Sequence, residues 1–352
     1  MINLNELCVS IHETVIDTIK QLDKGAKKVI FVVEDDLLVG AVTDGDIRRW
    51  ILKNGDLSAP VTEIMNKKPI YVYEHQRVYA VNLLKEHQLQ AIPLINKEHK
   101  IIDVIFLSDI FKKQDRKTIA EDIDCPVVIM AGGKGTRLHP YTKVLPKPLI
   151  PIGDLTIIER IINQFKEFNC NEFYITVNYK KNMIKAYLED KADDYRIKYI
   201  EEEKFLGTGG SLYLLKDALA GSFFVSNCDI LVEADYADIL KYHKENGYKI
   251  TMVTSLKNYV IPYGVVEIEQ GGSIKQMLEK PEFNFHVNTG LYVLESEILK
   301  DIPENEFFHI TDLINMYIKK GEKVGIYPVT ENSWMDMGEI KQMENMSKKF
   351  EL

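Results

Sequence analysis

The sequence has little of what marks membrane, secreted or disulfide-rich proteins. Its apolar runs are shorter than the ~18 residues that a membrane helix needs, so we expect no membrane span and no membrane partner. The first residues lack the basic start and apolar core of a signal peptide. The cysteines are scattered, without a C-x-x-C pair, which argues against a disulfide framework or a zinc site; they are Cys8, Cys125, Cys170 and Cys228. We therefore expect a cytoplasmic protein with reduced thiols.

The chain also lacks an excess of basic residues. Its 352 residues carry 44 Lys and Arg against 53 Asp and Glu, a net charge of −9, and no stripe combines aromatic with basic side chains. Nucleic-acid binding requires a basic face, so we expect no nucleic-acid partner. The apolar and charged contents, 45% and 28%, are ordinary for globular proteins, and the length suggests about two or three domains.

Acidic residues are absent from one stretch in particular, Met130 to Gly153. An apolar run at 126–129 precedes it and predicts a buried strand. The glycines that follow, Gly132, Gly133 and Gly135, allow a tight turn that brings backbone N–H groups close to an anion. Four cations then follow without any counter-charge: Lys134, Arg137, Lys143 and Lys147. This pattern predicts a polyphosphate site, although a glycine turn with a solvated basic face is the simpler alternative.

Two well-known phosphate loops do not match this stretch. Walker A requires G-K-[ST], whereas Gly135 is followed by Thr136 and Arg137, and the dinucleotide fingerprint fails because Leu138 stands at its third glycine. The remaining pattern, G-G-x-G-T-R-L followed by P-K-P-L at 146–149, resembles the signature of sugar-1-phosphate nucleotidylyltransferases.

The rest of the second part alternates strands with helices. We expect strands over 173–177, 197–200 and 223–226 and helices over 180–188 and 207–219, with a capping box at Thr156 and Glu159. Further along, 236–243 reads as a core-facing helix with His243 at the surface. This rhythm predicts an α/β fold with a Rossmann-like, mixed and mostly parallel sheet, whose ligands bind at the carboxyl ends of the strands.

An internal repeat organises the first third. Apolar runs begin at Val29 and Ala91, 62 residues apart, and each lies between helical segments and a second strand. Duplicated units of this kind, with Gly40–Ile47 and Val61–Met65, resemble a pair of CBS domains (α+β). The resemblance implies an adenine nucleotide at Thr43 and Asp46, whereas the second copy has Phe106 at the Thr position and keeps Asp109. The alternative is a packing or dimerisation module in which Thr43 and Asp46 only cap a helix.

A highly charged tract at 111–124 reads as the linker between domains. We therefore predict a tandem CBS module over 1–118 and a catalytic domain over 119–352. Because CBS pairs commonly stack in twos, we also expect a homo-oligomer.

The transferase resemblance implies a set of site residues. The nucleotide would be bound by Ala131, Gly132, Gly133, Gly135, Thr136, Glu202 and Gly207, and the sugar phosphate by Gly264, Glu279, Lys280 and Asn288. Asp229 and Asp336, 107 residues apart, would hold Mg²⁺, which takes one or two carboxylates beside substrate phosphates. Each carboxylate taken alone could equally be a solvated loop charge, a helix cap or a turn residue.

The reaction implied is transfer of a nucleoside monophosphate from an NTP to a sugar 1-phosphate, with release of pyrophosphate. In it, Arg137 would neutralise the pyrophosphate and Lys147 would lie between the sugar phosphate and the α-phosphate. The glutamates at 201–203 favour GTP, because a carboxylate accepts from N1–H and N2–H of guanine; UTP, CTP and dTTP stay open, and the sugar is a hexose or amino-hexose. The alternative class is a non-catalytic nucleotide sensor.

Overall fold

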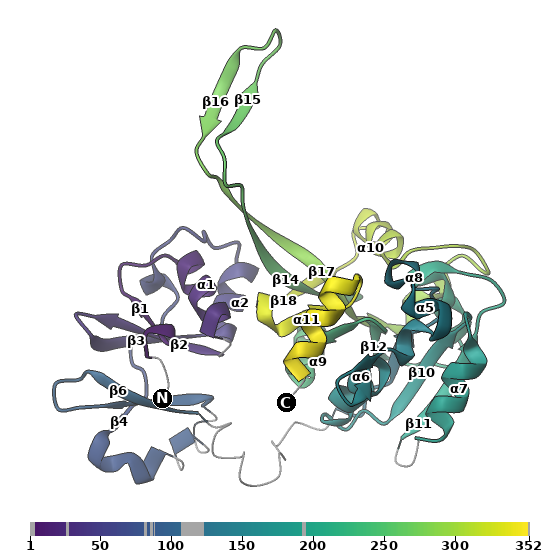
Figure 1. The fold of residues 1–352 in the computed structure, drawn as a ribbon, viewed down its shortest axis with the longest axis horizontal. Helices are drawn as coiled ribbons and strands as arrows, with labels where there is room; N and C mark the ends of the chain where they lie inside the picture. Colours follow the sequence, from purple (N-terminus) through teal and green to yellow (C-terminus); the bar gives the residue numbers. More distant parts are fainter. Residues whose placement is uncertain are drawn as a thin grey trace. The chain divides into compact units, whose positions relative to one another are not determined.

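The computed structural model describes residues 4–25, 28–80, 83–84, 87, 89–106, 123–191 and 195–350. The chain forms two compact units, Met1–Ile119 and Ala120–Leu352 (Figure 1). The predicted boundary after residue 118, most of the predicted linker and Asp109 lie outside the described residues, so the boundary stays a prediction.

The first unit repeats one small sheet. In each copy a short strand pairs in parallel with a central strand, which pairs in turn with an antiparallel partner. The strands are β1 (Cys8–Ser10), β2 (Val29–Glu34) and β3 (Leu37–Thr43), then β4 (Val72–Tyr73), β5 (Ala91–Ile95) and β6 (Ile101–Phe106). The helices are η1 (Leu4–Glu6), α1 (Val15–Gly25), α2 (Asp44–Leu52), η2 (Val61–Glu63) and η3 (Glu74–Tyr79). The repeated order and direction confirm the internal duplication seen in the sequence.

One apolar cluster joins the two copies of the first unit. Phe31 of β2 packs with Ala91 of β5 and with Val104 and Phe106 of β6, all at most 7% exposed. Phe106 therefore fills the core at the position where the first copy has Thr43. A bulky apolar side chain explains why the second copy lacks the hydroxyl of the first.

The second unit is organised around a seven-stranded sheet in the order β11-β10-β7-β12-β17-β14-β18, in which only β17 runs against the others. Its strands are β7 (Val127–Met130), β10 (Glu172–Val177), β11 (Arg196–Glu201), β12 (Ser222–Asn227), β14 (Ile250–Val260), β17 (Glu282–Glu295) and β18 (Val324–Val329). The mixed, mostly parallel sheet confirms the predicted fold class.

Helices cover both faces of this sheet. Val127 and Ile129 of β7 belong to one apolar cluster, whereas Val128 and Met130 belong to another, as the period of two in a strand requires. The first cluster contains the apolar stripes of α6 (Ile157–Lys166), α7 (Lys181–Glu189) and α9 (Tyr236–Asn246), and the second those of α10 (Ile310–Lys319), η6 (Ser211–Leu215) and η7 (Ser296–Asp301). β7 is therefore buried on both sides, and its loop is held at a fixed edge.

The predicted capping box at the start of α6 is confirmed, and two other predictions are wrong. Thr156 and Glu159 exchange side-chain and backbone hydrogen bonds. The helix predicted over 207–219 is one turn, α8 (Gly207–Gly210), followed by η6. His243 is not at the surface: its side chain is fully buried, with Nδ1 2.8 Å from Thr251 Oγ1 and Nε2 3.1 Å from Glu295 Oε1.

Shorter elements complete the second unit. Three two-stranded sheets pair β8 (Pro151–Ile152) with β9 (Leu155–Thr156), β13 (Ile230–Val232) with β19 (Trp334–Asp336), and β15 (Val265–Ile268) with β16 (Ile274–Leu278). The remaining helices are η4 (Thr136–Leu138), α5 (Tyr141–Val144), η5 (Lys147–Leu149), η8 (Glu331–Ser333) and α11 (Ile340–Phe350). No helix among the described residues has the length and apolarity to cross a membrane.

Candidate active site

The loop after β7 is shaped by Gly135 and by the residues packed against it. Gly135 has φ +63°, and a Cβ added there would lie 3.0 Å from Thr142 and 3.1 Å from Lys147. The hydroxyl of Thr142 donates to the carbonyl of Gly135 over 2.9 Å. Only glycine fits both the backbone angle and the space, so the loop and Lys147 are fixed against each other.

Lys147 reaches from this loop to the end of β12. It starts η5 between two prolines and is 8% exposed. Its Nζ donates to Oδ2 of Asp229, two residues past β12. The ion pair fixes the lysine side chain beside the end of β12.

Asp229 and Asp336 are brought together by the small β13–β19 sheet. Ile230 lies opposite Asp336 in the antiparallel register, and the amide of Met337 donates to the carbonyl of Asp229 over 2.9 Å. The two predicted metal ligands are thus neighbours in space despite their separation in sequence. Asp336 also accepts from the amide of Gly338 over 2.6 Å.

The surroundings of Asp336 disfavour its negative charge. Burial raises the pKa of its carboxyl, and the negative charge of Asp229 raises it further. The hydrogen bond from the amide of Gly338 and the charges of Lys147 and Arg137 lower it, but by less. Arg137 also lies close to Asp336: a Cβ added at Gly338 would be 3.5 Å from Arg137 Nη1. A cation between the two carboxylates would offset the repulsion that raises the pKa of Asp336.

Glu202 lies against the backbone of the glycine loop. It is 6% exposed, and a Cβ on Gly132 would stand 2.5 Å from its Oε1. Asn178 Nδ2 donates to its carbonyl over 2.8 Å, and the amide of Leu206 lies 3.4 Å from its Oε2. Burial raises the pKa of the Glu202 carboxyl. Hydrogen bonds from the amide of Leu206 and from the side chains of Thr176 and Ser211 oppose that rise.

Gly207 serves a packing role that the sequence did not indicate. Its φ is +80°, and a Cβ there would stand 2.6 Å from the carbonyl oxygen of Phe308. The amides of Gly209 and Gly210 donate to that same oxygen over 2.9 and 3.0 Å. The glycines of this segment therefore let it pack against the chain before α10.

The predicted sugar-side residues fall into two groups. Asn288, on β17, accepts from the amide of Gly290 and donates to the hydroxyl of Tyr292 over 2.9 and 2.6 Å. Gly290 packs against Asn227 at the end of β12, so Asn288 lies near the edge that carries Asp229. Gly264, Glu279 and Lys280 lie instead at the base of the β15–β16 hairpin, where a Cβ on Gly264 would stand 3.2 Å from Glu279. No described hydrogen bond or ion pair joins these three to the β7 loop.

Thr43 and Asp46 form a capping box at the start of α2. The hydroxyl and amide of Thr43 donate to Asp46 Oδ2 over 2.6 and 2.9 Å, and Asp46 also pairs with Arg49. This is the structural role weighed as the alternative to adenosine binding. It leaves the ligand hypothesis untested.

Two asparagines without a predicted role also contact the site: Asn178 binds the carbonyl of Glu202, and Asn227 packs against Gly290. Asn227 was visible as part of the Ser-Asn-Cys-Asp tract that ends at Asp229. No sequence motif indicates Asn178, because its partner is a backbone carbonyl, which every residue type has.

Comparison with known proteins gives this site a family. The nucleotidyl transferase family matches residues 126–351, and the CBS domain matches residues 2–53 and 61–116. The bifunctional protein GlmU of Methanococcus maripaludis is 34% identical over 220 residues, which cover 60% of this chain and 51% of that protein. The mannose-1-phosphate guanylyltransferase catalytic subunit beta of Dictyostelium discoideum is 32% identical over 222 residues, 61% of each chain.

Among solved structures, that of HddC from Yersinia pseudotuberculosis aligns with a TM-score of 0.52 at 23% identity, over 64% of this chain and all of HddC. The chain spans about half the length of the GlmU that it matches, and somewhat more of the Dictyostelium protein. The chain belongs to the nucleotidyl transferase family, with a pair of CBS domains ahead of the transferase unit.

Proposed function

We propose that this chain transfers a nucleoside monophosphate from an NTP, preferably GTP, to a hexose or amino-hexose 1-phosphate. The observation that carries the proposal is the meeting of Lys147, Asp229 and Asp336 beside a glycine loop that contains no acidic residue. A phosphate oxygen of the sugar phosphate attacks the α-phosphorus. The bond from that phosphorus to the β-phosphate's bridging oxygen breaks, and pyrophosphate leaves.

The attacking group is already an anion, so no general base is required. The protein's task is to position two polyanions and offset their repulsion. In this proposal Lys147 would contact both the attacking phosphate and the α-phosphate, and Arg137 would balance charge on the departing pyrophosphate. Lys280 would bind the sugar phosphate, and Glu279, Gly264 and Asn288 would contact the sugar.

The residues present fit a bound Mg²⁺. Asp229 and Asp336 provide the hard oxygen ligands that this ion prefers, and their mutual repulsion is what a divalent cation removes. When bound, the ion would neutralise charge on the α- and β-phosphate oxygens.

Glu202 supports guanine as the base. Its buried carboxylate can accept from both N1–H and N2–H of guanine, and the rim of the glycine loop lies directly against it. The Dictyostelium relative is named a guanylyltransferase, which agrees with this choice.

The test is a pyrophosphate-release assay with five NTPs against a panel of sugar 1-phosphates. We expect release with at least one hexose or amino-hexose 1-phosphate, fastest with GTP, and none after chelation of divalent ions. Absence of release from every pair, with nucleotide binding retained, would favour the sensor alternative.

A further inference from the structure

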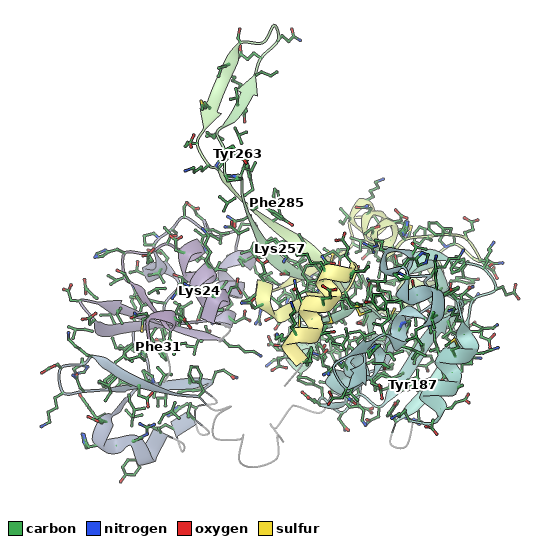
Figure 2. All side chains as sticks on the ribbon, viewed as in Figure 1. Lys24, Phe31, Tyr187, Lys257, Tyr263 and Phe285 are labelled. Atoms are coloured by element: carbon green, nitrogen blue, oxygen red, sulfur yellow. The ribbon has the colours of Figure 1, made fainter. Side chains whose placement is uncertain are left out.

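A long ribbon leaves the large sheet of the second unit. The outer halves of β14 and β17 pair as far as Val260 and Glu282, and the β15–β16 hairpin follows them. We call residues 257–285 the arm. Figure 1 shows the hairpin standing clear of the sheet. Lys257 and Phe285 lie opposite each other, and Figure 2 places Tyr263 further along the arm.

The hairpin of the arm is apolar on one face. Val266 lies opposite Met277, and Ile268 lies opposite Ile274. Val266 and Ile268 are two residues apart, and a register shift between Glu267 and Ile268 takes up the extra residue of β16, so all four side chains lie on the same side. They are 45 to 69% exposed. The other face carries Glu267 opposite Gln276, with Lys275 paired to Glu267.

The lower part of the arm continues the apolar character. Tyr259 lies opposite Phe283, and Phe285 lies two residues further along the same face. The rings contact one another, with centroids 6.2 and 6.3 Å apart, yet all three are 37 to 54% exposed. An aromatic ladder that remains this exposed requires a cover.

The exposed apolar area is large enough for a stable interface. Seven apolar side chains on the faces just described are 37 to 69% exposed: Tyr259, Val266, Ile268, Ile274, Met277, Phe283 and Phe285. At about 150–250 Å² for a large side chain, they present roughly 800 Å². A standard interface buries about 800 Å² per partner, whereas the largest patch on a typical monomer is about 300–600 Å².

A two-stranded hairpin is also marginally stable by itself in water. We propose that the arm docks on the arm of a second copy of this chain, apolar face against apolar face. The face of the hairpin is uncharged and therefore complementary to itself, as a two-fold interface requires. The arm holds three lysines against four glutamates, which disfavours an anionic membrane as the cover. This inference does not depend on the proposed activity.

The first experiment measures mass by light scattering on the full-length chain at 1 to 100 μM. We expect about twice 40.6 kDa for the wild type and for Gln276→Lys, which adds charge on the polar face. Ile268→Lys combined with Ile274→Lys adds charge on the apolar face and should halve the mass. A monomeric wild type would overturn the proposal.

A second experiment detects the arm contact even if the CBS pairs also associate. Met277→Cys should form a disulfide-linked dimer under mild oxidation, whereas Gln276→Cys and the wild type should not. Equal cross-linking of Met277→Cys and Gln276→Cys, or none in either, would overturn arm-to-arm docking. Near-ultraviolet circular dichroism of each variant shows that the fold is kept.

Discussion

The contact between Lys147 and Asp229 connects the loop after β7 to the end of β12. Asp229 lies just past the end of β12 and Lys147 begins η5, and their ion pair is among the shortest between described side chains. Asp336 then adds a second carboxylate, whose pKa is raised by burial and by Asp229. These few residues carry the proposed chemistry, so single substitutions test it directly.

We expect Asp229→Asn to lower kcat by at least about 10²–10³-fold, because it removes a charge at the centre of the proposed site while keeping the side-chain shape. Asp217→Asn, at an exposed position, is the matched control and should leave kcat unchanged. Pyrophosphate release gives the rates, and thermal unfolding shows that both variants fold. Near-normal turnover in Asp229→Asn would remove this residue from the site.

Glu202→Gln tests the base. The substitution replaces a carboxylate by an amide that can accept only one of the two guanine donors, so kcat/KM for GTP should fall by about 10- to 100-fold. The exposed neighbour in Glu203→Gln should show no loss. If the two variants keep the same ratio of GTP to ATP turnover as the wild type, Glu202 does not read the base.

Gly135→Ala tests the shape of the loop. An added Cβ meets Thr142 and Lys147 and requires a positive φ, so we expect a loss of about 1 kcal/mol or more of stability. Gly133→Ala adds the same atom into open space and should change the melting temperature little. Equal melting temperatures for the two variants would show that the loop adapts freely.

At the scale of elements, β14, α9 and β17 meet around His243. Burial lowers the pKa of His243, although the hydrogen bond and charge of Glu295 raise it. The ring is therefore neutral in the folded protein at neutral pH. An Nε2–H directed to Glu295, with Nδ1 accepting from Thr251, satisfies both ring nitrogens. Ser222 donates to the same oxygen of Glu295 over 2.6 Å. Since Ser222 belongs to β12, this network couples four elements.

The network predicts a pH-dependent stability. Because the folded pKa of His243 lies below the unfolded value near 6.5, the unfolded chain binds more protons as the pH falls below it. The contribution of neutral His243 to the free energy of unfolding is complete above pH ~6.5 and is lost as the pH falls through the folded pKa. Melting temperatures between pH 7.5 and 5 should fall less steeply in His243→Gln than in the wild type or in His12→Gln, at an exposed site. Equal slopes in all three would contradict this account.

Local patterns predicted the strand–loop start of the site and the cap of α6, because glycine turns and capping boxes are determined by a few adjacent residues. Local patterns gave wrong predictions where contacts between residues far apart in the sequence determine the structure. Residues 207–219 have helical spacing, but Gly207 is held at positive φ by Phe308, a hundred residues away, and the helix does not continue. His243 was assigned to the surface because the sequence does not show that Glu295 and Thr251 face it. The meeting of Asp229 with Asp336 likewise depends on the pairing of β13 with β19.

At the scale of the whole molecule, the chain joins a duplicated unit to a transferase unit, and the question is whether one affects the other. Energetic coupling between two sites is reciprocal for binding. An adenine nucleotide that binds at Thr43 and Asp46 and changes turnover would therefore itself bind differently when substrate is present.

We expect AMP or ATP to change pyrophosphate release by the full-length chain, and Thr43→Ala to abolish that response. Since Thr43 also caps α2, its removal costs about 1 kcal/mol of stability, so Thr43→Ser, which keeps a hydroxyl, is the control and should retain the response. An identical, unresponsive rate in all three proteins would leave the duplicated unit a structural role.

The pairing of β13 with β19 also has a consequence for biosynthesis. The glycine loop, Lys147 and Asp229 are translated first, whereas the second carboxylate emerges from the ribosome only with Asp336. A nascent or prematurely stopped chain that ends before β19 would lack one of the two proposed metal ligands. The proposed activity therefore begins only when nearly all of these 352 residues have been made.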